Sequence, residues 1–101
     1  MAKTQTNNRK QTSTGLQEPR QYNVVFHNDD FTPMDFVVSV LRSVFHKSEA
    51  DAQALMMKVH KEGNAIVGTY TLDIAASKAS RAIRLARNEN YPLSVTVEPC
   101  F

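Results

Sequence analysis

The stretch NDDFTPM, residues 28–34, decides the fold because it separates a strand-like segment from a helix-like one. Residues 22–26 before it are rich in β-branched and aromatic side chains, with one firmly apolar face, which predicts a half-buried strand. We expect Thr32 to be the N-cap of the helix that follows, Pro33 its first residue and His46 to lie near its end. Apolar residues recur along that helix at helical spacing: Met34, Val37, Val38, Leu41, Val44 and Phe45.

Helix capping does not explain why three further polar side chains, Asn28, Asp29 and Asp30, crowd just before the helix. One interpretation is local: Asn28 and Asp29 make an Asx turn that holds the start of the helix. The other interpretation is that the carboxylates and the carboxamide bind a cationic group. Local chemistry leaves both interpretations open.

The rest of the chain continues as alternating helices and strands. Ser48 is a typical N-cap and Gly63 a typical helix stop, and between them Ala52, Leu55, Met56 and Val59 form one apolar stripe with His60 at its edge. Residues 65–71 predict a second strand, in which Gly68 marks a bulge or a close approach. Residues 72–88 predict an alanine-rich helix, and residues 93–97 predict a last strand after the break at Asn90 and Pro92.

This order of elements predicts an α+β domain over residues 21–101. We expect a small three-stranded antiparallel sheet with three helices packed on one face. The 101 residues and the hydrophobic content of 42% suit a single domain, and no apolar run approaches the ~20 residues of a membrane span. We expect a monomer.

The net charge of +2 belongs to the N-terminal end of the chain. Residues 1–20 hold four basic residues and one acidic residue, whereas residues 21–101 hold eight basic and nine acidic residues. A near-neutral body disfavours a nucleic-acid-binding surface, which normally shows a clustered basic face. The basic side of the predicted third helix, with Lys78, Arg81 and Arg84, is in most proteins only a solvated face.

Residues 1–20 are almost entirely polar, so we expect a flexible N-terminal tail. This tail is either without function or an arm that a partner grips. Cys100 is the only cysteine and is expected to have no chemical role. The absence of both a disulfide pair and an apolar leader favours a reducing cytoplasm.

Three ordered blocks of the sequence carry a resemblance: residues 28–37 (NDDFTPMDFV), 55–60 (LMMKVH) and 63–68 (GNAIVG). In these blocks, and from about residue 22 to residue 98, the chain resembles the ClpS adaptor family. The resemblance implies a non-enzymatic adaptor that recognises the N-terminal residue of degradation substrates, the N-end rule pathway. It also implies delivery of those substrates to the ClpA-type AAA+ unfoldase of the ClpAP protease.

The resemblance assigns roles residue by residue, with no cofactor and no metal. It implies that the substrate α-amine is bound by Asn28, Asp29 and His60, and that Asp30 and Thr32 support the rim. It implies that the walls of a hydrophobic pocket are Met34, Val37, Met56, Val59 and Leu93. Asp73 and Lys78 match positions that touch the N-terminal domain of the unfoldase, although this chain has Asp at a position where Glu is common.

Spacing alone would leave Met56 and Val59 as ordinary core and His60 as a structural histidine. A metal site built from Asp29, Asp30, His27 and His60 lacks the usual ligand spacing, which disfavours an enzyme of that kind. The remaining alternative is a protein-interaction domain that recognises another peptide feature, with the acidic turn purely structural. If His60 accepts a bond from an ammonium group, binding should weaken below about pH 6.5, where histidines take up a proton.

Overall fold

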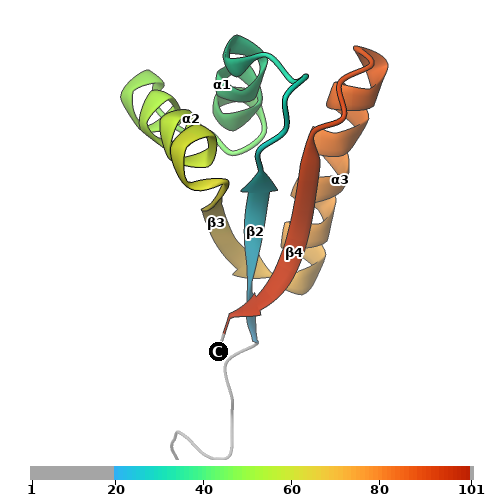
Figure 1. Ribbon diagram of the computed structural model, residues 1–101. Coiled ribbons are helices and arrows are strands. Elements are labelled where there is room, and N and C mark those ends of the chain that lie inside the picture. Colours follow the sequence, from blue (N-terminus) through green and yellow to red (C-terminus); the bar gives the residue numbers. More distant parts are fainter. Residues whose placement is uncertain (1–19, 101) are drawn as a thin grey trace, which may run out of the picture.

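The computed structural model describes residues 20–100 and shows the predicted α+β fold (Figure 1). The predicted tail, apart from Arg20, lies outside the described residues. Three helices and a three-stranded antiparallel sheet confirm the predicted fold class. Their bounds in chain order are β2 Gln21–His27, α1 Met34–Ser43, α2 Glu49–Glu62, β3 Asn64–Thr71, α3 Leu72–Asn88 and β4 Ser94–Cys100.

The sheet has the strand order β3-β2-β4, so the first strand within residues 20–100 is its centre. Both neighbours run antiparallel to β2. The pairing with β3 shifts between Val24↔Gly68 and Val25↔Ile66, which leaves Val67 as an extra residue and confirms the predicted irregularity at Gly68. A side chain at Gly68 would overlap the hydroxyl of Tyr70 and lie 2.6 Å from its ring carbon Cζ, so glycine allows the close approach of that ring.

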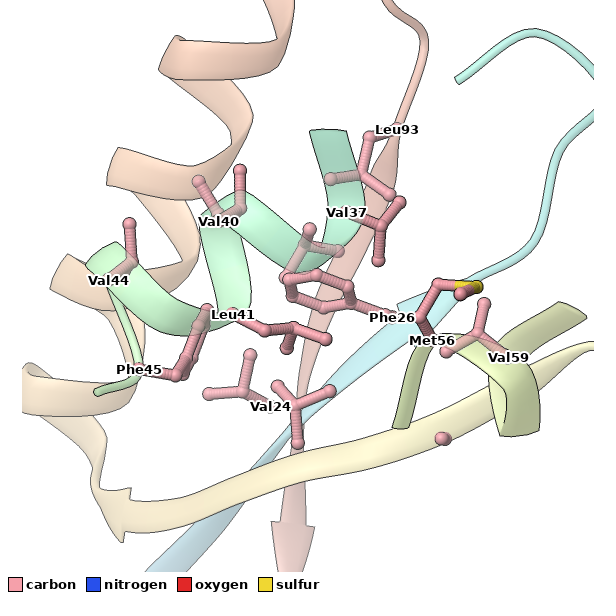
Figure 2. Close-up of a cluster of buried hydrophobic side chains, with 14 of the residues drawn as sticks. Val24, Phe26, Val37, Val40, Leu41, Val44, Phe45, Met56, Val59 and Leu93 are labelled. Carbon is pink, nitrogen blue, oxygen red and sulfur yellow. The ribbon is translucent and has the colours of Figure 1, made fainter. Parts of the chain in front are cut away.

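The core lies between the helices and the sheet face that carries Val24 and Phe26, both fully buried. Phe26 meets Phe45 edge to face, with their ring centroids 5.5 Å apart. Figure 2 shows this cluster continuing from Phe45 past Leu41 to Met56 and Val59 on α2. The apolar stripe predicted for α2 is therefore core at Met56 and Val59, while the same two residues also face the hollow described below.

The ends of α2 follow local chemistry as predicted. The Ser48 hydroxyl accepts a hydrogen bond from the Asp51 N–H at 3.1 Å, which is the N-cap arrangement. Gly63 ends the helix in the left-handed conformation, with a φ of 91°.

The ends of α1 differ from the prediction. Pro33, not Thr32, is the N-cap residue, and its apolar ring cannot cap the helix. The Thr32 hydroxyl donates to the Asp29 carboxylate at 2.8 Å instead of capping the helix. The helix ends at Ser43, short of His46, which has a φ of 57° and turns the chain toward α2. Periodicity could not show this early end because Val44 and Phe45 are buried beyond the helix as well as along it.

Candidate functional site

A hollow of about 200 Å³ opens where the end of β2, the start of α1 and the C-terminal half of α2 meet. Because β2 pairs antiparallel with β3, His27 lies opposite Asn64, and the residues after His27 become neighbours of the last turn of α2. The Asn28 N–H donates to the Gly63 carbonyl at 2.9 Å and fixes this junction. All nine lining residues belong to the predicted set: Asn28, Asp29, Asp30, Thr32, Met34, Val37, Met56, Val59 and His60.

Asp29 holds the turn that forms one side of the hollow. Its Oδ1 accepts hydrogen bonds from the backbone N–H groups of Phe31 at 2.8 Å and Thr32 at 2.7 Å. Its Oδ2 accepts the Thr32 hydroxyl at 2.8 Å. This is the Asx turn of the local interpretation, and it occupies three of the roughly four lone-pair positions of a carboxylate.

The same contacts keep Asp29 ionised. Partial burial alone would raise the pKa of Asp29, but the hydrogen bonds from Thr32 and Phe31, with a smaller effect of the Arg87 charge, outweigh it. The pKa of Asp29 therefore lies below its ordinary value of 3.8. A negative charge is present at the mouth of the hollow at neutral pH.

Three polar side chains around the hollow have no hydrogen-bond partner within residues 20–100. They are the Asn28 carboxamide and the Asp30 carboxylate, both from the turn, and the His60 imidazole from α2. All three residues are exposed. Acceptors from two separate elements thus border the hollow without competing bonds to the other described residues, an arrangement that suits a ligand with hydrogen-bond donors.

The deeper part of the hollow is apolar. Val37, Met56 and Val59 are at least nine-tenths buried yet line it, and Figure 2 shows Met56 and Val59 side by side on α2. Met34 at the start of α1 is 43% exposed and lies at the surface of the hollow. A cavity of about 150 Å³ is known to hold benzene, so this hollow has room for one large apolar side chain.

Leu93, the remaining predicted wall residue, is not among the residues that line the hollow. It is 1% exposed and belongs to the same core cluster as Val37, and Figure 2 shows the two at one end of that cluster. Leu93 therefore lies behind the wall rather than in it.

Asp73 and Lys78, the predicted unfoldase contacts, lie apart from the hollow at the start of α3. Thr71, just before that helix, pairs with Gln21 at the first residue of β2, whereas the hollow follows the last residue of β2, about 20 Å along the strand. Asp73 is exposed and accepts the Thr71 hydroxyl at 2.9 Å. The Lys78 ammonium is bound internally, donating to the Val44 carbonyl at 2.9 Å.

Two further features, metal-binding clusters and membrane-spanning helices, are not found in the part of the chain that the structure describes. Within residues 20–100, no three His, Cys, Asp or Glu side chains are grouped to hold a metal ion. Over the same residues, none of the helices has the length and apolar content needed to cross a bilayer.

Fold and site together define a small α+β binding domain with an acidic, acceptor-rich rim over an apolar hollow. The model of the family described as "ATP-dependent Clp protease adaptor protein ClpS" matches residues 17–96. The chain therefore belongs to the ClpS adaptor family, whose members are adaptors of the Clp protease rather than proteases themselves, and the predicted resemblance is confirmed.

Named relatives and a solved structure agree with this family assignment. The chain is 54% identical to the adapter protein ClpS of Treponema denticola over 81 residues, covering 80% of each chain. It is 44% identical to that of Acetivibrio thermocellus over 91 residues, covering 90% of this chain and 92% of the relative. The structure of Agrobacterium tumefaciens ClpS2 bound to L-phenylalaninamide superposes with a TM-score of 0.80 at 41% identity, covering 82% of this chain and all of that one.

Proposed function

We propose that this chain binds the free α-amino group and the bulky hydrophobic side chain of a protein N-terminus and delivers the bound protein to a ClpA-type unfoldase. The preferred first residues are Phe, Leu, Tyr and Trp. The observation that carries this proposal is a single hollow whose rim holds acceptors without a partner in residues 20–100 and whose deeper walls are buried and apolar. The ligand of the Agrobacterium relative, L-phenylalaninamide, has the two groups that we propose this chain recognises: a free α-amine and one apolar side chain.

The rim suits an α-ammonium group, which offers three N–H donors in a tetrahedral arrangement. The Asn28 carboxamide oxygen and a neutral His60 nitrogen supply two acceptors from opposite elements. A carboxylate supplies the third acceptor and the compensating charge. Each charge-assisted bond contributes about 1.5–3 kcal/mol, which an internal peptide segment without a free amine could not obtain.

Two residues, Asp29 and Asp30, could supply this carboxylate, and they differ in the hydrogen bonds that they already make. Asp29 already accepts three bonds from its own turn, so its part is to shape the rim and to offer its charge and one remaining lone pair. Asp30, predicted to support the rim, borders the same hollow without a hydrogen-bond partner in residues 20–100, so it offers the amine a second carboxylate beside Asp29. Thr32 supports the rim through its two bonds to Asp29.

The apolar walls account for the preference among first residues. Burying a Phe or Leu side chain contributes about 1.5–3 kcal/mol, and the Met34 and Met56 thioethers adapt to rings and branched chains alike. Met34 at the mouth disfavours side chains branched at Cβ, which are widest next to the backbone. Added to the amine contacts, this burial suffices for micromolar or tighter binding.

Delivery requires a second surface that does not compete with the first. Asp73, Leu72 and Ile74 at the start of α3 are exposed, with Leu72 52% and Ile74 47% accessible, at the opposite end of β2 from the hollow. A partner seated there would leave the hollow open. We assign the unfoldase contact to this region, with Asp73 as its charged residue.

The test is fluorescence anisotropy with labelled peptides of about ten residues that differ only in the first residue. We expect binding of Phe, Leu, Tyr and Trp peptides, and at least about tenfold weaker binding of Ile, Val, Arg and acetyl-Phe peptides, because acetylation removes the ammonium donors. His60→Ala and Asp30→Asn should weaken the Phe peptide, whereas Lys61→Ala, the next position of α2 and outside the hollow, should not. Equal affinity for Phe and acetyl-Phe peptides would instead support the alternative function, recognition of another peptide feature.

A further inference from the structure

The connection between α3 and β4 lies against the part of the core that backs the hollow. It leaves the helix through Glu89 and Asn90, which has a φ of 63°, and the Tyr91 N–H donates to the Ala86 carbonyl at 2.9 Å. Pro92 follows, and it has no N–H to donate. Backbone bonding of the sheet resumes only at Ser94, which pairs with His27.

The Arg87 side chain donates hydrogen bonds to two backbone carbonyls of this connection. The two N–H groups of its Nη1 donate to the Tyr91 carbonyl at 2.8 Å and to the Leu93 carbonyl at 3.0 Å. One guanidinium thus joins the carbonyls on both sides of Pro92 and ties them to the last turn of α3. Arg81 and Arg84, earlier on the same helix, make no side-chain bond within residues 20–100.

The residues that Arg87 holds meet the first turn of α1 at Phe36. The Tyr91 ring meets Phe36 edge to face, with their centroids 4.9 Å apart. Leu93, 1% exposed, belongs to the same core cluster as Val37, and Figure 2 draws both at the same end of that cluster. Val37, the next residue after Phe36 in α1, is a wall of the hollow, so the contact between Tyr91 and Phe36 links the residues that Arg87 holds to that wall.

We propose that Arg87 is a positioning residue that fixes the apolar wall of the binding hollow, through Leu93 and Tyr91, and so sets side-chain selectivity without touching the substrate. The proposal rests on the proposed function, because it concerns the same hollow. It separates two properties of the site. Amine recognition depends on the rim at Asn28 and His60, which Arg87 affects only through the small effect of its charge on Asp29, whereas the depth and width of the hollow depend on the carbonyls that Arg87 holds.

The test compares Arg87→Met, which keeps the side-chain stem but removes both bonds, with Arg84→Met as a matched control. Affinities for Phe, Val and acetyl-Phe peptides are measured after circular dichroism has shown each variant to be folded. A misfit of one methylene in a hydrophobic pocket changes selectivity about 10- to 200-fold. Arg87→Met removes no atom of the wall and only frees it to move, so its effect should lie at or below the lower end of that range. We expect the Phe-to-Val affinity ratio to fall about five- to tenfold in Arg87→Met and to stay unchanged in Arg84→Met.

If Arg87→Met does not fold, Arg87→Lys replaces it, and we expect a smaller fall of the same ratio, about twofold. A ratio equal to that of the wild type in a folded Arg87 variant would overturn the proposal, as would an equal loss for every peptide. Either result would mean that Arg87 stabilises the end of α3 and affects only the amount of folded protein, not the selectivity of the hollow. Failure of the wild type to distinguish Phe from acetyl-Phe would instead refute the proposed function itself.

Discussion

Lys78 gives the sharpest prediction, because the structure gives it an internal role where the family resemblance implies an external one. Its ammonium donates to the carbonyl of Val44, the C-cap residue of α1, at 2.9 Å. It also lies 5.8 Å from the Phe45 ring centroid and 5.4 Å from that of Tyr70. One positive charge therefore joins α3 to the end of α1 and to β3.

The magnitude follows from these contacts. A hydrogen bond from a charged donor contributes about 1.5–3 kcal/mol, and a cation–π contact at a partly exposed site about 0.5–1 kcal/mol. A cation at a helix C-terminus adds a few tenths more, and solvent screening reduces the sum. Methionine keeps the packing of the stem. We therefore expect Lys78→Met to lower the free energy of unfolding by about 2 kcal/mol, or the Tm by about 10 °C for a domain of this size.

The assay is urea unfolding followed by far-UV circular dichroism. Arg81→Met is the matched control, since Arg81 is an exposed cation on the same helix without a side-chain bond in residues 20–100. It should stay within about 0.5 kcal/mol of the wild type. A second measurement is binding to the isolated N-terminal domain of a ClpA-type unfoldase. There we expect Asp73→Asn to weaken docking more than Lys78→Met does, while Asp73→Asn, at an exposed position, lowers the free energy of unfolding by less than about 1 kcal/mol.

Lys78→Met with the stability of the wild type would refute this reasoning. The bond to Val44 would then contribute nothing, and the ammonium would be free to serve a partner.

Two further predictions concern stability. The carboxylate of Asp29 has a pKa below its ordinary value of 3.8, so it stabilises the fold above that pH, and its contribution is lost as the pH falls through the lower folded-state value. In urea unfolding, Asp29→Asn should thus be less stable than the wild type at about pH 7, with the difference shrinking below about pH 4; a constant difference would contradict this. Gly68→Ala should cost about 1–3 kcal/mol in the same assay, because the new methyl group overlaps Tyr70 and must displace its ring; an unchanged midpoint would mean that the ring moves at no cost.

Local chemistry made most of the fold predictable. Ser48 and Gly63 end α2 where expected because a cap and a left-handed stop act over a few residues, whatever surrounds them. Residues 72–88 form α3 with the predicted bounds. The start of α1 was not predictable in the same way, since Thr32 had two partners available, the helix N-terminus and Asp29, and only their positions in space decide between them.

The candidate site was predictable as a set of residues but not as an arrangement. The blocks around Asn28 and His60 carry the family resemblance, and the hollow brings them together. The sequence could not show that Asp29 is engaged by its own turn while Asp30 is not. It also gave no sign that Leu93 lies behind the wall rather than in it.

The sequence by itself determined the order of the elements, the ends of α2 and the family, because each depends on neighbours in the chain or on motifs within it. The tertiary structure alone decided which of those residues share one surface. Antiparallel pairing of β2 with β3 sets Asn28 beside Gly63, and the turn before β4 brings Arg87 to the carbonyls of Tyr91 and Leu93. Contacts between elements distant in the chain depend on sheet register and packing, which no single stretch of the sequence encodes.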